Sequence, residues 1–404
     1  MKYIEGGVCA ANGFRASGIH CGIRRNKTKA DLALICSDVP CSGAAVYTTN
    51  LVKGAPLTVT RKHLENGIAQ AVIVNSGNAN TCNANGIDVA EAMCSLVTDA
   101  IGIPSNDVLV ASTGVIGQPL PLDPIKNGMA QLVSGLSYNG SEAAAFAIMT
   151  TDLAKKEVAV EFEIDGKICR MGGIAKGSGM IHPNMATMLV FITTDAAISS
   201  EMLQKALSTD VQNTFNMISV DGDTSTNDNV IVLANGMAGN KLIDVENEDF
   251  AIFMKALNSV TVSLSRMIAS DGEGATKLLE CSVSGAASET DAKIVAKSVV
   301  CSSLLKAAMF GADANWGRIL CAIGYSGANV DVQKVSVSFV SSKGEICVCQ
   351  NGAGVEFSEE KAKEILLEKE IEIRIGLGDG DSASAAWGCD LTYDYVKING
   401  DYRT

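Results

Sequence analysis

The sequence has little from which a metal or redox centre could be built. It contains three histidines, and its thirteen cysteines are scattered without a Cys-x-x-Cys pair. Structural zinc sites need Cys and His ligands at close spacing, and disulfide frameworks use even sets of Cys in short chains. Cys347 and Cys349 would share one face of a strand and could supply half of a metal site. We expect instead that both are buried thiols, because free cysteine behaves as a small apolar residue. We therefore expect no metal.

Long apolar runs and concentrated positive charge are also missing. The longest unbroken apolar run, Ala143–Met149, is far too short to cross a bilayer. Met1–Gly7 lacks the apolar core of a signal peptide. The net charge is -13 and no cluster of Lys and Arg stands out, which disfavours binding to nucleic acid or to an anionic membrane. With 47% hydrophobic and 19% charged residues, the composition is that of a globular protein, which we expect to be cytoplasmic.

Several common catalytic and binding motifs are absent or incomplete. The sequence has no phosphate-binding G-x-x-x-x-G-K-[ST], no G-x-S-x-G and no H-E-x-x-H. Asp221 begins a run that resembles a calcium loop, but Thr226 replaces the required Gly and Val232 the required Glu. The run Gly376–Gly380 is followed by Asp381 where a dinucleotide fingerprint needs Gly. Nucleotide-binding, serine hydrolase, zinc protease and EF-hand functions are therefore not expected.

The hydrophobic pattern predicts an α/β fold with layers of helices on sheets. Residues 156–171 alternate as a hairpin around Asp165-Gly166, and residues 335–348 do so around Lys343-Gly344. Continuous apolar runs predict strands buried on both faces at Ala71–Val74, Val108–Val110 and Val230–Leu233. Amphipathic periodicity predicts helices at Asp88–Ile101, Ser200–Phe215, Asp249–Ile268 and Ala292–Phe310. A cluster of small and polar residues at Ser282–Asp291 suggests a boundary, with a smaller C-terminal subdomain at about 286–404.

One glycine-rich segment, Gly172–Leu189, could carry covalent chemistry. It leads through Pro183 to Ala186-Thr187 and then into an apolar, strand-like run. On its chemistry alone, a surface loop feeding a buried strand is the simpler interpretation, since Thr is common in strands. A threonine hydroxyl becomes a good nucleophile when a base lies beside it, and its own α-amine can be that base after the preceding peptide bond is cut.

A second segment could supply an oxyanion hole. Asp107–Gly117 reads as a strand that enters a Gly-rich turn. Thr113 offers a hydroxyl and Gly114 an unobstructed backbone N–H, the donors that stabilise a developing alkoxide. Taken alone, a plain strand-to-loop turn is the simpler interpretation of this pattern.

Nine short motifs, in chain order and reaching the last residue, resemble those of one family. They are Asn75–Asn80, Ser112–Gly117, Met149–Asp152, Lys176–Met180, Met185–Leu189, Asp221–Asp228, Asp271–Lys277, Asn315–Arg318 and Ile398–Thr404. The chain resembles the ornithine acetyltransferase family (glutamate N-acetyltransferases) along nearly its whole length. One departure is Asp313-Ala314, where the family pattern has Asp-Pro; it affects no catalytic residue.

The resemblance implies a self-processing enzyme. Thr187 would be exposed by cleavage after Ala186, giving chains 1–186 and 187–404, and its hydroxyl would carry acetyl from N2-acetylornithine to glutamate. The implied fold is the layered α/β sandwich that the family shares with self-processing aminopeptidases. The two chains would stay associated, as a dimer of such pairs, and would use no cofactor. Whether acetyl-CoA also serves as a donor is left open.

The resemblance also implies the roles of individual residues. Thr113 and Gly114 would form the oxyanion hole. Substrate contacts would come from Thr150, Lys176, Thr187, Glu273, Asn399 and Thr404.

The chemistry of these residue types agrees with such roles. Lys176 suits a substrate α-carboxylate, and Glu273 suits the side-chain ammonium of ornithine. Without the resemblance, Lys176 and Glu273 would be taken as solvated, and Asn399 and Thr404 as loose tail residues. We expect His182 to be structural or solvated.

The sequence is also compatible with two other functions. A self-processed aminopeptidase or amidase would pass the acyl group to water, and a non-enzymatic small-molecule binding protein would need no peptide cleavage.

Overall fold

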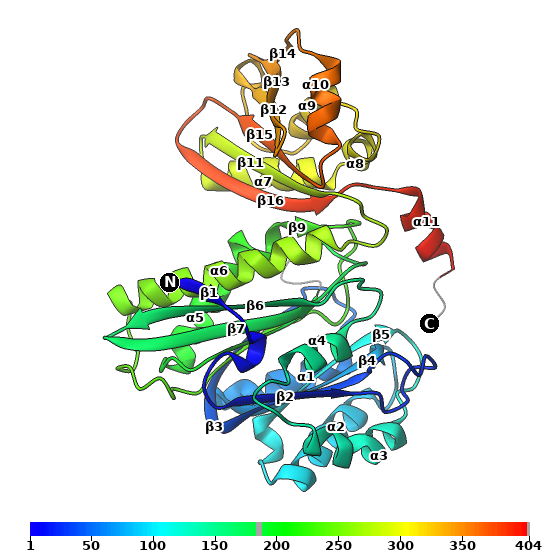
Figure 1. Ribbon diagram of the computed structural model, residues 1–404, viewed down its shortest axis with the longest axis vertical. Coiled ribbons are helices and arrows are strands. Elements are labelled where there is room, and N and C mark those ends of the chain that lie inside the picture. Colours follow the sequence, from blue (N-terminus) through cyan, green and yellow to red (C-terminus); the bar gives the residue numbers. More distant parts are fainter. Residues whose placement is uncertain (183–187, 402–404) are drawn as a thin grey trace.

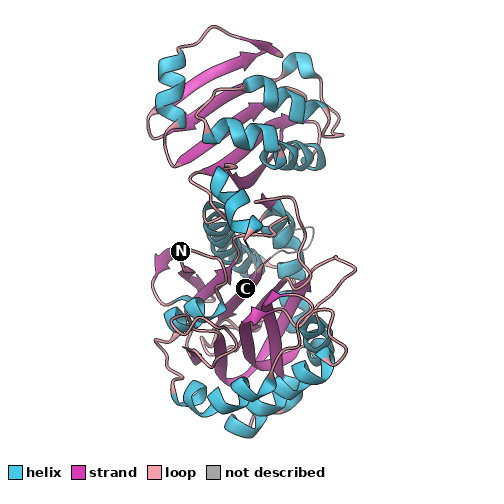
Figure 2. Ribbon diagram, turned by 90° about the vertical axis from the view of Figure 1, so that its right-hand side faces the viewer, coloured by secondary structure: helices cyan, strands magenta, loops and turns pink. Residues whose placement is uncertain are grey.

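The computed structural model describes residues 1–182 and 188–401, which form two bodies stacked along the long axis (Figure 1). Each body is built around its own sheet, as the view turned by 90° also shows (Figure 2). No helix in the described ranges is long and apolar enough to cross a membrane. Ala186, Thr187 and Thr404 lie outside the described residues.

The first body contains a nine-stranded sheet in which β8 with β10 and β4 with β5 run parallel and the other neighbours antiparallel. In spatial order its strands are β1 (Lys2–Ile4), β6 (Lys156–Ile164), β7 (Lys167–Lys176), β8 (Leu189–Thr194), β10 (Asn229–Ala234), β3 (Leu32–Tyr47), β4 (Ile68–Asn78) and β5 (Val108–Val115), with β2 (Phe14–Ile19) paired to β3.

Helices cover both faces of this sheet (Figure 1). They are α1 (Ala55–His63), α2 (Gly86–Ile101), α3 (Leu122–Ser134), α4 (Ser141–Ile148), α5 (Ser200–Asp210) and α6 (Glu248–Ser270). The long helix α6 lies on β6 and β7, α5 lies on β3, and α4 packs against β2 and β3. All six residues of β8 and all six of β10 are buried, which explains the continuous apolar runs Leu189–Ile192 and Val230–Ala234 within them.

The second body contains a seven-stranded sheet. In spatial order its strands are β14 (Ala353–Gly354), β13 (Gly344–Gln350), β12 (Ser336–Ser341), β15 (Glu370–Gly376), β11 (Leu278–Ala286), β16 (Ser382–Cys389) and β9 (Ile218–Ser219). Its helices are α7 (Glu289–Cys301), α8 (Ser303–Phe310), α9 (Trp316–Gly324) and α10 (Glu359–Leu366). The last helix, α11 (Tyr393–Gly400), leads back towards the first body (Figure 1).

Short 3-10 helices connect the main elements. They are η1 (Gly7–Cys9), η2 (Leu64–Asn66), η3 (Ser105–Asp107), η4 (Val211–Asn213), η5 (Phe215–Met217) and η6 (Val332–Lys334). The second sheet includes β11, which begins at residue 278, and β9, which lies at residues 218–219, so both begin before the predicted boundary. The subdomain at about 286–404 stays a prediction.

The structure confirms the α/β class and both hairpins. The first hairpin pairs β6 with β7, and its turn residues Asp165 and Gly166 have φ of 51° and 68°. Two positive φ values in a two-residue turn match the right-handed twist of the strands that it joins. The helices predicted at 88–101 and 249–268 correspond to α2 and α6.

Two predicted helices are wrong in extent. The helix expected at 200–215 ends at Asp210, where the Thr214 hydroxyl donates to the Asp210 carbonyl and replaces the next helical hydrogen bond. The helix expected at 292–310 is divided at Ser302. The Ser302 hydroxyl accepts from the Leu305 N–H and so begins a new helix, α8.

The prediction that Cys347 and Cys349 are both buried is also wrong. Cys349 is buried, but Cys347 is exposed. The pairing of β12 with β13 shifts register between Val337 and Ser338, so that Cys349 lies opposite Val337 and Cys347 opposite Ser338. A bulge of this kind breaks the alternation of faces, so residues two apart no longer share one.

Candidate active site

A pocket of about 360 Å³ brings together segments that are far apart in the sequence. Met188, the first residue described after the gap, is part of its wall. So are six of the residues expected from the sequence: Thr113, Gly114, Thr150, Lys176, Glu273 and Asn399. The other three, Ala186, Thr187 and Thr404, lie outside the described residues.

The backbone near the end of β5 explains why a glycine stands at position 114. Gly114 has a φ of 130° and lies opposite Gly77 on the parallel strand β4. A Cβ on Gly114 would lie 2.3 Å from the Gly77 carbonyl carbon, so no larger residue fits without movement of the backbone. The close approach of the strands places Thr113 and Gly114 together at the pocket wall, as an oxyanion hole would require.

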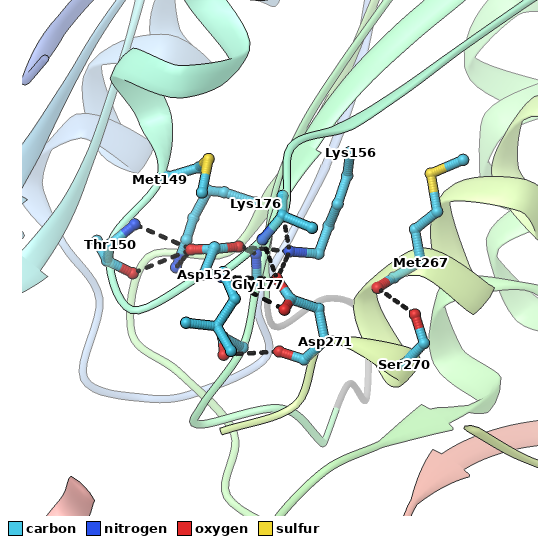
Figure 3. Close-up of polar contacts among 12 residues, drawn as sticks. Met149, Thr150, Asp152, Lys156, Lys176, Gly177, Met267, Ser270 and Asp271 are labelled. Carbon is cyan, nitrogen blue, oxygen red and sulfur yellow. Dashed lines mark hydrogen bonds and ion pairs between the residues drawn. The ribbon is translucent and has the colours of Figure 1, made fainter. Parts of the chain in front are cut away.

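A buried carboxylate, Asp152, organises the loop beside the pocket (Figure 3). Its Oδ1 accepts from Lys156 Nζ at 2.8 Å and from the Gly177 N–H at 2.7 Å. Its Oδ2 accepts from the Thr150 N–H at 2.9 Å. Lys156 Nζ also lies 2.6 Å from Asp271 Oδ2. These contacts tie the loop before β6, the end of β7 and the loop after α6 into one unit.

Lys176, at the end of β7, is buried beside this carboxylate. Its side chain is 9% exposed, and its Nζ lies 4.0 Å from Asp152 Oδ2. Burial lowers the pKa of Lys176, and Asp152 opposes that effect. Burial would raise the pKa of Asp152, but Lys176 and Lys156 outweigh it and hold that pKa well below its usual value. Asp152 is therefore ionised at neutral pH and supports a positive charge on Lys176.

A second buried carboxyl lines the pocket at Asp228, directly before β10. Its Oδ2 has no hydrogen-bond partner within residues 1–182 and 188–401. Burial raises the pKa of Asp228 well above its usual value, although Ser225 and Lys176 act in the other direction. Sequence reasoning did not single out Asp228 or Asp152. Both lie in motifs that carry the family resemblance, and burial, the property that sets them apart, is not visible there.

Glu273 and Asn399 form another part of the wall. Asn399, on α11, donates from Nδ2 to Glu273 Oε2 at 2.8 Å. The Glu273 N–H donates to the Ser178 carbonyl, and a Cβ on Gly179 would lie 2.4 Å from the Glu273 carboxyl group. The Gly-rich segment therefore has to stay small for the carboxylate to fit. Glu273 is 8% exposed, so it is not the solvated residue that its sequence alone would suggest.

His182 is not part of the pocket lining. Its Nδ1 is 3.1 Å from Ser219 Oγ and 3.5 Å from Cys301 Sγ, and its carbonyl accepts from the Thr224 hydroxyl. Burial, with help from the positive charge of Lys297, lowers the pKa of His182 to about 4. A neutral, half-buried ring in these contacts suits the structural role expected for it.

Comparisons with known proteins give a consistent result. The model of the ArgJ family matches residues 15–404. The arginine biosynthesis bifunctional protein ArgJ of Caldanaerobacter subterraneus subsp. tengcongensis is 52% identical over 405 residues and covers 100% of both chains. The Bacillus anthracis protein of the same name is 48% identical over 405 residues, covering 100% of this chain and 98% of its own. The crystal structure of the Bacillus halodurans protein argJ is 49% identical, with a TM-score of 0.51, and covers 54% of this chain and 100% of its own.

Proposed function

The chain belongs to the ArgJ family, and on that premise we propose that it transfers acetyl from N2-acetylornithine to glutamate, yielding ornithine and N-acetylglutamate for arginine biosynthesis. The observation that carries the proposal is the convergence of the expected oxyanion donors, a buried cation and a buried carboxylate on one pocket. N-acetylornithine presents a carboxylate, a cationic side chain and an acyl carbonyl, and the pocket offers a complementary group to each.

Thr187 is the proposed nucleophile. In the sequence it directly precedes Met188, which is part of the pocket wall. The Thr187 hydroxyl attacks the Ala186 carbonyl and replaces the peptide bond with an ester. Water then hydrolyses the ester, which leaves the Ala186 carboxylate and the free α-amine of Thr187.

The length of a solved relative supports two separate chains. The curated relatives match over their full length, whereas the solved Bacillus halodurans chain matches, along all of its own length, only 54% of this chain. Residues 187–404 number 218 (404 minus 186), which is the same fraction.

Acetyl transfer takes place in two halves. The Thr187 hydroxyl attacks the acetyl carbonyl while the α-amine of Thr187 accepts its proton, and Thr113 and Gly114 donate to the oxyanion. Collapse of the intermediate breaks the amide bond, and the proton passes to the leaving amine of ornithine. The α-amine of glutamate then attacks acetyl-Thr187, loses a proton and restores the hydroxyl.

The remaining residues orient the substrates. Lys176 binds the α-carboxylate that both amino acids carry, and Glu273, held by Asn399, binds the ammonium of the ornithine side chain. Thr150 and Thr404 complete the contacts implied by the family. The word bifunctional in the relatives' names supports a second activity, which we propose is acetylation of glutamate by acetyl-CoA. We further propose a cytoplasmic enzyme whose two kinds of chain stay associated, as a dimer of pairs, without a cofactor.

Intact-mass spectrometry tests the processing and the covalent step together. The purified protein should consist of chains 1–186 and 187–404, and N-acetylornithine should add one acetyl mass to the second. Thr187→Ala should stay one full-length, inactive chain, whereas Thr98→Ala, which does not line the pocket, should be processed and active.

Cleavage of the Thr187→Ala chain at the same bond would contradict the role of the hydroxyl. Release of free acetate at the same rate with and without glutamate would indicate an amidase instead. A single uncleaved wild-type chain that binds amino acids would indicate a binding protein.

A further inference from the structure

A second cavity, of about 580 Å³, adjoins the active-site pocket. The two share the wall residues Gly114, Thr150 and Thr151, so the second cavity meets the first beside the proposed oxyanion hole. We call this second cavity the annex.

The annex is lined by cations and by no carboxylate. Arg24, Arg25 and Lys29 contribute to its wall, and no described Asp or Glu does. This arrangement stands out in a chain whose net charge is -13. Cations that converge on a concave surface without an opposing acid attract an anionic ligand.

The loop that carries these cations is held in place from within. The buried carboxylate of Asp31, which does not line the annex, accepts the N–H groups of Cys21 at 2.7 Å, Gly22 at 3.2 Å and Arg24 at 3.0 Å. The Arg24 guanidinium donates to the Met149 carbonyl, next to the shared wall. The loop therefore presents its charges without having to be ordered by a ligand first.

The active-site pocket alone cannot treat both substrates equally. Among the described residues that line it, Lys176 is the only lysine or arginine, whereas Glu273 and Asp228 both contribute carboxyl groups. N-acetylornithine ends in an ammonium that Glu273 attracts. Glutamate ends in a carboxylate that Glu273 would repel if both side chains took the same path.

We propose that the annex is the acceptor subsite, in which the side-chain carboxylate of glutamate is bound by the cations of the 24–29 loop. This assignment rests on the proposed acetyl transfer to glutamate. With its α-amine beside Gly114 and its side chain in the annex, glutamate avoids Glu273. The side chains of bound ornithine and glutamate then extend from the oxyanion hole in different directions, so that one nucleophile can react with two substrates whose side chains carry opposite charges.

The decisive variant is the double substitution Arg25→Gln with Lys29→Gln. Both side chains are exposed, so the fold should not depend on them. Lys27→Gln is the matched control, since Lys27 is exposed on the same loop but does not line the annex. In ping-pong kinetics, kcat/KM for each substrate reports its own half-reaction, so the effects on donor and acceptor can be separated.

Exposed charges contribute weakly, so each substitution should lower kcat/KM for glutamate by up to about fivefold and the pair by about tenfold. The value for N-acetylornithine should stay within about twofold of wild type, by the same reasoning. Glutamine, a neutral acceptor of the same shape, supplies a readout that a merely structural role would not move. In the double variant the preference for glutamate over glutamine should decrease together with kcat/KM for glutamate. The salt dependence of the reaction with glutamate should also decrease.

Each other outcome overturns the assignment. A loss confined to acetyl-CoA would show that the annex binds the phosphates of a thioester donor. Equal losses for both amino acids would show a structural role, and no change at all would show a solvated surface. A wild-type enzyme without glutamate-dependent transfer would instead refute the proposed function.

Discussion

Asp152→Asn tests whether the carboxylate beside the pocket supports the site as the contacts suggest. The substitution keeps the shape of the side chain but removes a charge that is fully shielded from solvent. Lys156 Nζ, 2.8 Å away, and Lys176 Nζ, 4.0 Å away, both lose a counter-charge.

The expected loss of folding free energy depends on the contacts that each lysine retains in the variant. Removing one partner of a buried ion pair costs about 3–5 kcal/mol of folding free energy. Lys156 keeps Asp271 at 2.6 Å, and the Asn oxygen can still accept one backbone N–H. We therefore expect a loss of about 2–3 kcal/mol at pH 7, below that range.

The pH dependence has a definite sign. The folded-state pKa of Asp152 lies below its unfolded value of about 3.9, so its stabilisation is complete above that pH and is lost as pH falls through the folded-state pKa. The difference in unfolding free energy between wild type and variant should be constant from about pH 8 to 5 and shrink below about pH 4.

Urea denaturation followed by circular dichroism, at fixed chain concentration, measures this difference. Glu142→Gln is the control, because its ion pair with Lys155 is exposed and its loss should leave stability unchanged within error. A variant as stable as wild type at pH 7 would refute the reasoning. So would a difference that grows on acidification.

Three further predictions concern catalysis. Thr113→Ala should lower the turnover number about a hundred- to a thousandfold, the typical cost of one oxyanion donor, with substrate binding nearly unchanged in steady-state assays. A covalent acetyl-Thr187 requires ornithine to leave before glutamate reacts, so initial rates should give parallel double-reciprocal lines; intersecting lines without acetylated enzyme would exclude it. Glu273→Gln should slow acetyl transfer from N-acetylornithine more than transfer to glutamate in single-turnover assays, whereas Lys176→Met should slow both; equal losses for Glu273→Gln would assign that carboxylate a structural role.

Local patterns were sufficient for much of the fold. The alternation in β6 and β7 and the Asp165-Gly166 turn are properties of adjacent residues, so the hairpin could be predicted directly. The boundaries of helices could not be predicted as directly from the sequence. Ser302 divides α7 from α8 through its own hydroxyl, and Thr214 competes for the last turn of α5. Such competition between side chain and backbone is nearly balanced and depends on the surrounding packing.

The order of motifs was sufficient for the family and for the identity of the expected site residues, because these depend on residue types at fixed places along the chain. Their physical state depends on the fold. The burial of Lys176 and Glu273, and the annex formed by the 24–29 loop against Thr150, arise where distant segments meet.

Lys156 contacts Asp271 across 115 positions of the sequence. The burial and contacts of the site residues therefore depend on the tertiary structure. The order of strands in the nine-stranded sheet sets which loops face one another. That order results from packing of the whole domain, which local sequence patterns do not encode.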